Sequence, residues 1–133
     1  MIFRYLLIDY NVDAVLSFIL FFMNTFLVLF LAPASVITEW MKTDPAEREV
    51  SEKKMRAEWN TWMKAHAGMI KETKAGGKTK RVTSAGIADT RNDIMLYSII
   101  EAESHEIAAK TFEGHPHLGI PQASIEIMAV RSL

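Results

Sequence analysis

The sequence predicts an α+β domain in which strands and helices follow in the order β-α-β-β-α-β and build a four-stranded antiparallel sheet. Three observations predict it. Two apolar runs, residues 26–31 and 94–100, have the length and composition of buried strands. A long helical pattern follows the first run and a shorter one follows the second. Residues 123–130 then alternate apolar and polar side chains, which is typical of a final strand.

The segment after the first strand predicts two helices. Ser35 is expected to cap a short helical turn that ends at Met41. Asp44 is expected to cap a longer helix with Pro45 at its first position, and Gly68 to mark its end. Apolar side chains recur along this helix at spacings of three and four and form a stripe that can lie on a sheet: Met55, Trp59, Trp62, Met63, His66, Met69 and Ile70.

The second half of the chain predicts the remaining elements. Residues 71–78 are interpreted as a polar connection, and the alternating residues 79–84 as a strand near the edge of the sheet. Residues 89–93 are expected to be a loop. Residues 94–100 are expected to form the central strand, and Ser104 to cap a helix that runs to Phe112.

Composition limits the classes of function. The 133 residues correspond to about one domain. The net charge of −1 selects neither nucleic acid nor an acidic partner. Because cysteine is absent, disulfides, thiol catalysis and thiolate metal sites are excluded.

The first third of the chain is strongly apolar. The run from Ala14 to Ala32 is long enough for a membrane-spanning helix, and Ala32-Pro33-Ala34 resembles a signal cleavage site. Asn24 and Thr25 interrupt the run, however, and the segment before it carries one basic and two acidic residues. We therefore expect residues 1–22 to be an extension, as would result from a start assigned too early. A signal, a membrane anchor and an additional helix are the alternatives.

A family resemblance follows from this order of elements, which is the ferredoxin-like split β-α-β arrangement. Residues 23–133 are expected to form the domain, and from Met23 to Arg131 the chain resembles the YCII-related domains of the dimeric α+β barrel superfamily. The residues that carry the resemblance are the strand Thr25–Pro33, the helix with Trp59 and Trp62, the strand Tyr97–Ala102, the turn Gly114-His115-Pro116-His117-Leu118 and the strand from Ser124 to Ile127.

The resemblance implies a homodimer in which two sheets face each other and close a barrel, with a cleft between each sheet and its helices. Burial of one open apolar sheet face against a second copy is also physically reasonable. Well-known family members carry a histidine–aspartate pair, with the aspartate in an Asp-Pro turn. Here the turn reads His115-Pro116, so no aspartate is carried over, and the Asp-Gly-Pro-Phe signature of a sister group is absent.

His115 and His117 are the candidate catalytic residues. Imidazole titrates near neutral pH, which suits proton transfer. The structural alternative is that His115 caps a helix end and that His117 bonds a loop carbonyl. The candidate ligand-binding residues are Trp59, Trp62, His66, Tyr97 and Asp89. Aromatic side chains suit an organic ligand, although indoles on an amphipathic helix are more often part of the core.

Other motifs are weaker. No metal or cofactor is expected, although His66 with Asp89 or Asp93 is the combination that could complete a histidine metal site. Gly77-Lys78-Thr79 lacks the earlier glycine of a phosphate-binding loop. The basic residues between Lys71 and Arg81 have no interleaved aromatics, so nucleic-acid binding is not expected.

Two functional classes remain open from the sequence. The protein either binds or transforms a small organic molecule near His115 and His117, or it is a non-catalytic dimerisation or regulatory module with structural histidines. A cytoplasmic location is expected, with secretion or membrane anchoring through the N-terminal run as the alternative.

Overall fold

The computed structural model describes residues 23–133, and the expected extension, residues 1–22, lies outside the described residues. Four strands form one sheet: β1 (Asn24–Leu31), β2 (Ile70–Ala75), β5 (Ile94–Ala102) and β6 (Ser124–Val130). Their order is β2-β5-β1-β6, and each neighbouring pair is antiparallel. This is the ferredoxin-like topology, so the predicted fold class is confirmed, and β5 is an inner strand as expected.

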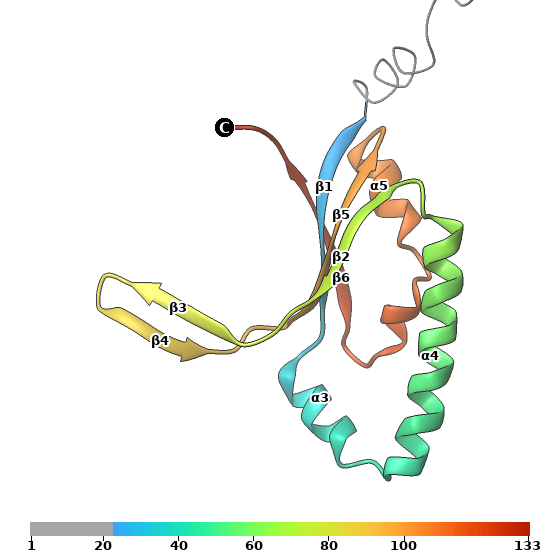
Figure 1. Ribbon diagram of the computed structural model, residues 1–133, viewed down its shortest axis with the longest axis vertical. Coiled ribbons are helices and arrows are strands. Elements are labelled where there is room, and N and C mark those ends of the chain that lie inside the picture. Colours follow the sequence, from blue (N-terminus) through green and yellow to red (C-terminus); the bar gives the residue numbers. More distant parts are fainter. Residues whose placement is uncertain (1–22) are drawn as a thin grey trace, which may run out of the picture.

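Helices lie along one face of this sheet (Figure 1). They are α4 (Pro45–Ala65), α5 (His105–Thr111) and the 3₁₀ helix η1 (Pro116–Gly119), while α3 (Ala34–Met41) lies beyond the end of β1. Two predicted caps are confirmed, because Asp44 accepts bonds from the amides of Ala46 and Glu47 and Ser104 accepts one from Ile107. The cap predicted at Ser35 is wrong: α3 begins one residue earlier and has no side-chain cap bond.

The end of α4 also differs from the prediction. The helix ends at Ala65 rather than at Gly68, because His66 leaves the helical conformation at φ −120°. The amide of Met69 then donates to the carbonyl of His66 and closes a turn. Met69 and Ile70, predicted at the end of the helical stripe, therefore follow the helix but still pack against the core.

The strand β2 corrects the interpretation of residues 71–78 as a connection. Most of that segment pairs with β5 at the edge of the sheet. Its sequence, IKETKA, lacks regular apolar alternation because an edge strand is half solvated, and charged side chains protect such an edge from further pairing.

A hairpin projects from the sheet on the side opposite the helices (Figure 1). It consists of β3 (Thr79–Thr83) and β4 (Gly86–Thr90), which pair only with each other. Residues 79–84, predicted as a strand of the main sheet, and residues 89–90, predicted as loop, thus belong to a separate two-stranded ribbon. We call residues 79–90 the arm.

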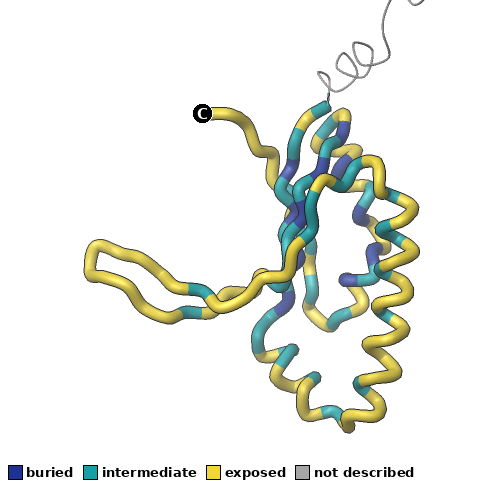
Figure 2. Tube along the Cα trace, viewed as in Figure 1, coloured by how far each residue is buried: buried dark blue, intermediate teal, exposed yellow. Residues whose placement is uncertain are grey.

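The core lies between the sheet and the helices. Alternate residues of the inner strands, Phe26, Val28, Phe30 and Ile100, are at most 2% exposed. Ala108 and Phe112 from α5 close this layer, and Trp59 and Trp62 of α4 pack against it. Figure 2 shows the buried segments on these inner strands and on the chain that faces them, while the outside of α4 is exposed.

The intervening residues of the same strands form the other face of the sheet, which no described helix covers. We call it the open face; it contains Leu27, Leu29, Tyr97, Ile99, Met128 and Val130. Most of these side chains are half-buried, and Met128 is 50% exposed. The sheet therefore has one covered and one uncovered apolar face.

None of the helices within residues 23–133 combines the length and the apolar character that crossing a membrane requires. The cytoplasmic location stays a prediction.

Candidate functional site

The turn that follows α5 places the two histidines against the sheet. Gly114 adopts φ +70°, a left-handed conformation that glycine accepts without strain, and reverses the chain. Pro116 opens η1 with its preset φ. His115 and His117 are thereby turned inward, and they are 1% and 2% exposed.

His115 is held in one tautomer. Its Nδ1 accepts a hydrogen bond of 3.0 Å from the backbone amide of His117, so the ring proton of the neutral imidazole sits on Nε2. Nε2 is buried and has no hydrogen-bond partner among the described residues. Burial lowers the pKa of His115 to about 4, and the charges of His117 and His66 act in the same direction. His115 is thus a neutral hydrogen-bond donor over most of the pH range.

His117 ties η1 to the end of β1. Its Nε2 lies 2.9 Å from the carbonyl oxygen of Leu31, to which it donates. Burial lowers the pKa of His117, and its bonds to the backbone of Leu31 and Ser124 oppose this shift.

Aromatic rings surround His115. Trp59 and Trp62 of α4 lie edge-to-face with its imidazole, at centroid distances of 4.4 and 4.5 Å. Phe30 lies 5.3 Å away. Edge-to-face packing of this kind lets an N–H meet an aromatic face, which partly compensates for a missing acceptor. We call this group the aromatic cluster: Phe30, Trp59, Trp62, Phe112 and His115.

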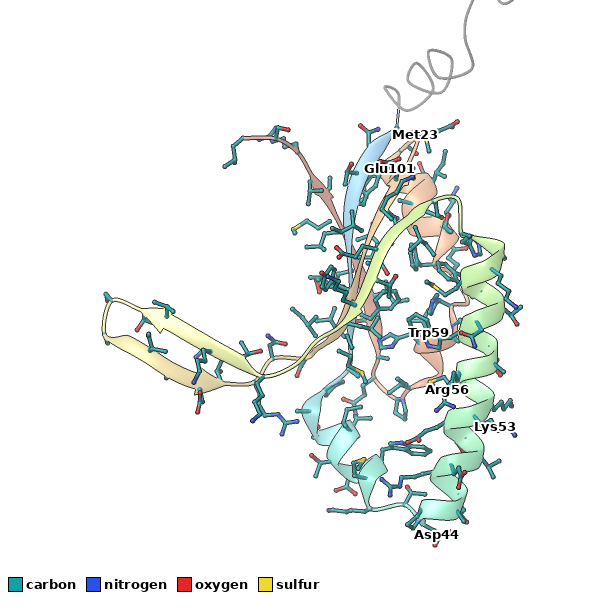
Figure 3. The ribbon with its side chains drawn as sticks, viewed as in Figure 1. Met23, Asp44, Lys53, Arg56, Trp59 and Glu101 are labelled. Carbon is teal, nitrogen blue, oxygen red and sulfur yellow. The ribbon has the colours of Figure 1, made fainter. Side chains whose placement is uncertain are left out.

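His66 lies at the border of the aromatic cluster. Its ring stacks on that of Trp62 at 4.2 Å, and its Nδ1 is 2.8 Å from the carbonyl oxygen of the same residue. Figure 3 shows Trp59 on the side of α4 that faces the sheet. The fold therefore brings together five of the predicted site residues, His115, His117, Trp59, Trp62 and His66.

Tyr97 and Asp89 lie elsewhere. Tyr97 is on the open face, where its hydroxyl donates to Glu72 at 3.4 Å, so the sheet separates it from the aromatic cluster. Asp89 lies on the arm and pairs with Lys80 at 2.7 Å. The fold does not join these two residues to the histidines.

A cleft of about 910 Å³ opens between α3, the first half of α4 and the segment between η1 and β6. Its lining is mostly apolar: Val36, Ile37, Trp40, Met41, Met55, Met95, Ile120 and Pro121. Met55 is one helical turn from Trp59, but no residue of the aromatic cluster is among the residues that line the cleft. The sequence interpretation missed Trp40 and Met41, although Val36, Ile37, Trp40 and Met41 have the spacing of an apolar helix face.

A second cavity, of about 1110 Å³, lies where the arm leaves the sheet, and its lining contains Asp89 and Asp93. His66 is not among its lining residues. Across residues 23–133 no three histidine, aspartate or glutamate side chains are grouped so that they could hold a metal ion. The combination of His66 with Asp89 or Asp93 is therefore not assembled.

Comparisons with known proteins give a distant structural relative. No family model matches the chain, and no curated protein matches it. One solved structure that it resembles is 5-chloro-2-hydroxyhydroquinone dehydrochlorinase (TftG) from Burkholderia phenoliruptrix, in its complex with 2,5-dihydroxybenzoquinone. The identity is 14%, the match covers 77% of this chain and 90% of that chain, and the TM-score is 0.43.

Proposed function

We propose that this protein binds a small, largely apolar organic molecule in the cleft between α3 and α4. The observation that carries the proposal is the cleft itself. Its volume of about 910 Å³ lies within the range of roughly 300–1,000 Å³ that ligand sites occupy. Its apolar walls are accompanied by the polar groups of Ser35, Glu39, Thr43, Ser51, Glu52 and Gln122, and apolar walls with some polar groups are the usual composition of such sites.

None of the aromatic cluster lines the cleft, so in this proposal the cluster supports the wall at Met55 from within the core. His115 has one polar atom without a hydrogen-bond partner among the described residues, the Nε2–H, but this atom is buried and His115 does not line the cleft. Proton abstraction by His115 is less well supported, because Nδ1 already accepts from the His117 amide. The catalytic roles of His115 and His117 belong to the proposal, as does the membership of the YCII-related family, which rests on the order of elements and the His115–His117 turn.

Filling the cleft tests the binding proposal. A Met55→Trp substitution places an indole in the cleft, while Val50→Trp places the same group on α4 at a residue that does not line the cleft and is 71% exposed. In a thermal-shift screen of the full chain with phenols, quinones and aromatic carboxylates, the wild type and Val50→Trp should share ligands that Met55→Trp no longer binds. If all three proteins bind the same set, the cleft is not the site.

We further propose that the open face is covered by a second copy of this chain. Support comes from β1, whose residues are apolar on both faces, a composition typical of strands buried on both sides. An interface of roughly 800 Å² per protomer is standard for a stable complex.

Charging the open face tests the homodimer. Leu29→Lys should convert the full chain to monomers in sedimentation experiments, because a lysine opposite Tyr97 would have to be desolvated. Val50→Lys, on the outside of α4, should leave the dimer intact. A wild type that is monomeric at high concentration would contradict the proposal and would leave the open face to residues 1–22 or to another protein.

A second candidate function is a dimerisation or regulatory module without ligand, with structural histidines. It is supported by the bonds from the His117 amide to His115 and from His117 to the Leu31 carbonyl. His115→Asn separates the two candidates, since an asparagine oxygen can still accept from the His117 amide. Retained stability with lost ligand binding would favour a binding role for the imidazole, and retained binding would favour a structural one.

A further inference from the structure

The arm exposes an apolar pair. Val82 of β3 and Ile87 of β4 lie directly opposite each other, so both side chains are on the same face of the ribbon. They are 75% and 71% exposed. A two-stranded hairpin alone is marginally stable in water, and both of its edges present unpaired backbone groups. Such a surface is expected to have a partner.

The base of the arm is fixed to the sheet. The amide of Gly76 donates to the carbonyl of Met95 at 2.8 Å, and a Cβ at this position would come within 3.1 Å of the carbonyl oxygen of Ile94. The amide of Ala32 likewise donates to Asp93 at 2.9 Å on the returning strand. The direction of the arm is therefore set by the sheet.

That direction places the arm on the same side as the open face. In Figure 1 the helices lie on one side of the sheet and the arm projects from the other. Figure 2 shows that the arm is exposed along nearly its whole length. A molecule that covers the open face must therefore lie beside the arm.

We infer that each arm lies against the second copy of this chain in the homodimer, with Val82 and Ile87 packed on the partner. This inference rests on the proposed homodimer and names a second contact within it. In a two-fold dimer each protomer gives one arm and receives one, so the contact forms twice.

Charge supports a second copy as the occupant. The arm and its base carry four basic residues, Lys78, Lys80, Arg81 and Arg91, against two acidic residues, Asp89 and Asp93, and Asp89 already pairs with Lys80. The open face carries the carboxylates of Glu72, Glu101 and Glu126; Lys74 and Lys71 pair with the first two, and Glu126 has no ion pair among the described residues. Opposite charges on the two surfaces favour this pairing over others.

The test uses the full chain with the double substitution Val82→Thr and Ile87→Thr, which keeps β-branched side chains in the ribbon while making its face polar. Val50→Thr is the matched control, because Val50 is equally exposed but lies on α4. We expect the double variant to raise the dimer dissociation constant about tenfold to a hundredfold, as removal of two apolar anchors implies, and the control to leave it unchanged.

Hydrogen exchange of the wild type gives an independent measurement. Amides of residues 79–90 should exchange more slowly above the dimer dissociation constant than below it. An unchanged dissociation constant, or arm amides that exchange equally fast in dimer and monomer, would overturn the arm contact while the homodimer stands. A wild type that never dimerises would overturn both, and would leave ligand binding in the cleft to its own test.

Discussion

The two faces of the sheet come from the same strands but have different surroundings. On the covered face Phe26, Val28 and Phe30 are buried by helices from their own chain. On the open face the intervening Leu27 and Leu29 are only half-buried. Both sets are equally apolar in sequence, so the difference lies in what covers them. The comparison teaches that a strand apolar on both faces requires two covers, and the described part of the chain supplies one.

Truncation of neighbouring residues in β1 should give the largest difference between the faces. Phe30→Ala should lower the free energy of unfolding by about 3–5 kcal/mol at any protein concentration, because Phe30 contacts Trp59, Phe112 and both histidines. Urea denaturation measures this.

Leu29→Ala is the control for that experiment. Its effect should be smaller in dilute protein and should grow with concentration, since dimerisation stabilises the folded state by mass action. Equal and concentration-independent effects at both positions would contradict the distinction between the faces.

Acid should lower the free energy of unfolding through the histidines buried on the covered face. His115 stays neutral in the folded protein down to its pKa of about 4, whereas an unfolded histidine takes up a proton near 6.5. Between these values the unfolded state binds more protons, so the free energy of unfolding should fall as pH falls, by on the order of 3 kcal/mol. Above pH 6.5 the group should have no effect. The lowered pKa of His117 acts in the same direction.

The measurement for acid sensitivity is denaturation of the wild type and of His115→Asn between pH 4 and 7.5. The variant should lose a large part of the pH dependence because its side chain does not titrate there. Identical pH profiles would show that the acid sensitivity lies in other groups.

Removal of a helix cap should lower the free energy of unfolding by less than these changes. The effect should be restricted to α4, which lies over the covered face of the sheet. Asp44→Ala removes the acceptor for the amides of Ala46 and Glu47, and should cost about 1 kcal/mol in the free energy of unfolding. Asp44→Ser should restore most of it. Thermal denaturation measures the change in stability. A change in the dimer dissociation constant as well would mean that α4 contributes to the interface.

The smallest effect is expected from removal of residues 1–22. We propose that residues 23–133 are the folding domain, because they contain the four-stranded sheet and the buried core that the structure describes. The shortened chain should have the same melting temperature as the full chain. If a second copy covers the open face, the dimer dissociation constant should also be unchanged. A shortened chain with a weaker dimer would mean that the first 22 residues contribute to the cover.

The sequence by itself determined the two inner strands, the final strand, the helices that follow each inner strand and two helix caps. Those features depend on local chemistry: continuous apolar runs, and Asp44 and Ser104 as acceptors for amides close in sequence. The turn at Gly114-His115-Pro116 was also found from residue types alone, together with the structural alternative for its histidines.

Only the tertiary structure decided the rest. β2 has the composition of a loop, and its pairing with β5 gives it a strand conformation at the sheet edge. Residues 79–84 have the alternation of a sheet strand, yet they pair within the arm. Alternation of apolar and polar side chains indicates a strand, but it does not indicate which other strand it pairs with. Tyr97 and Trp59 have similar chemistry, and only the sheet between them shows that they belong to different surfaces. Long-range contacts made these decisions, and local sequence does not encode which segments meet.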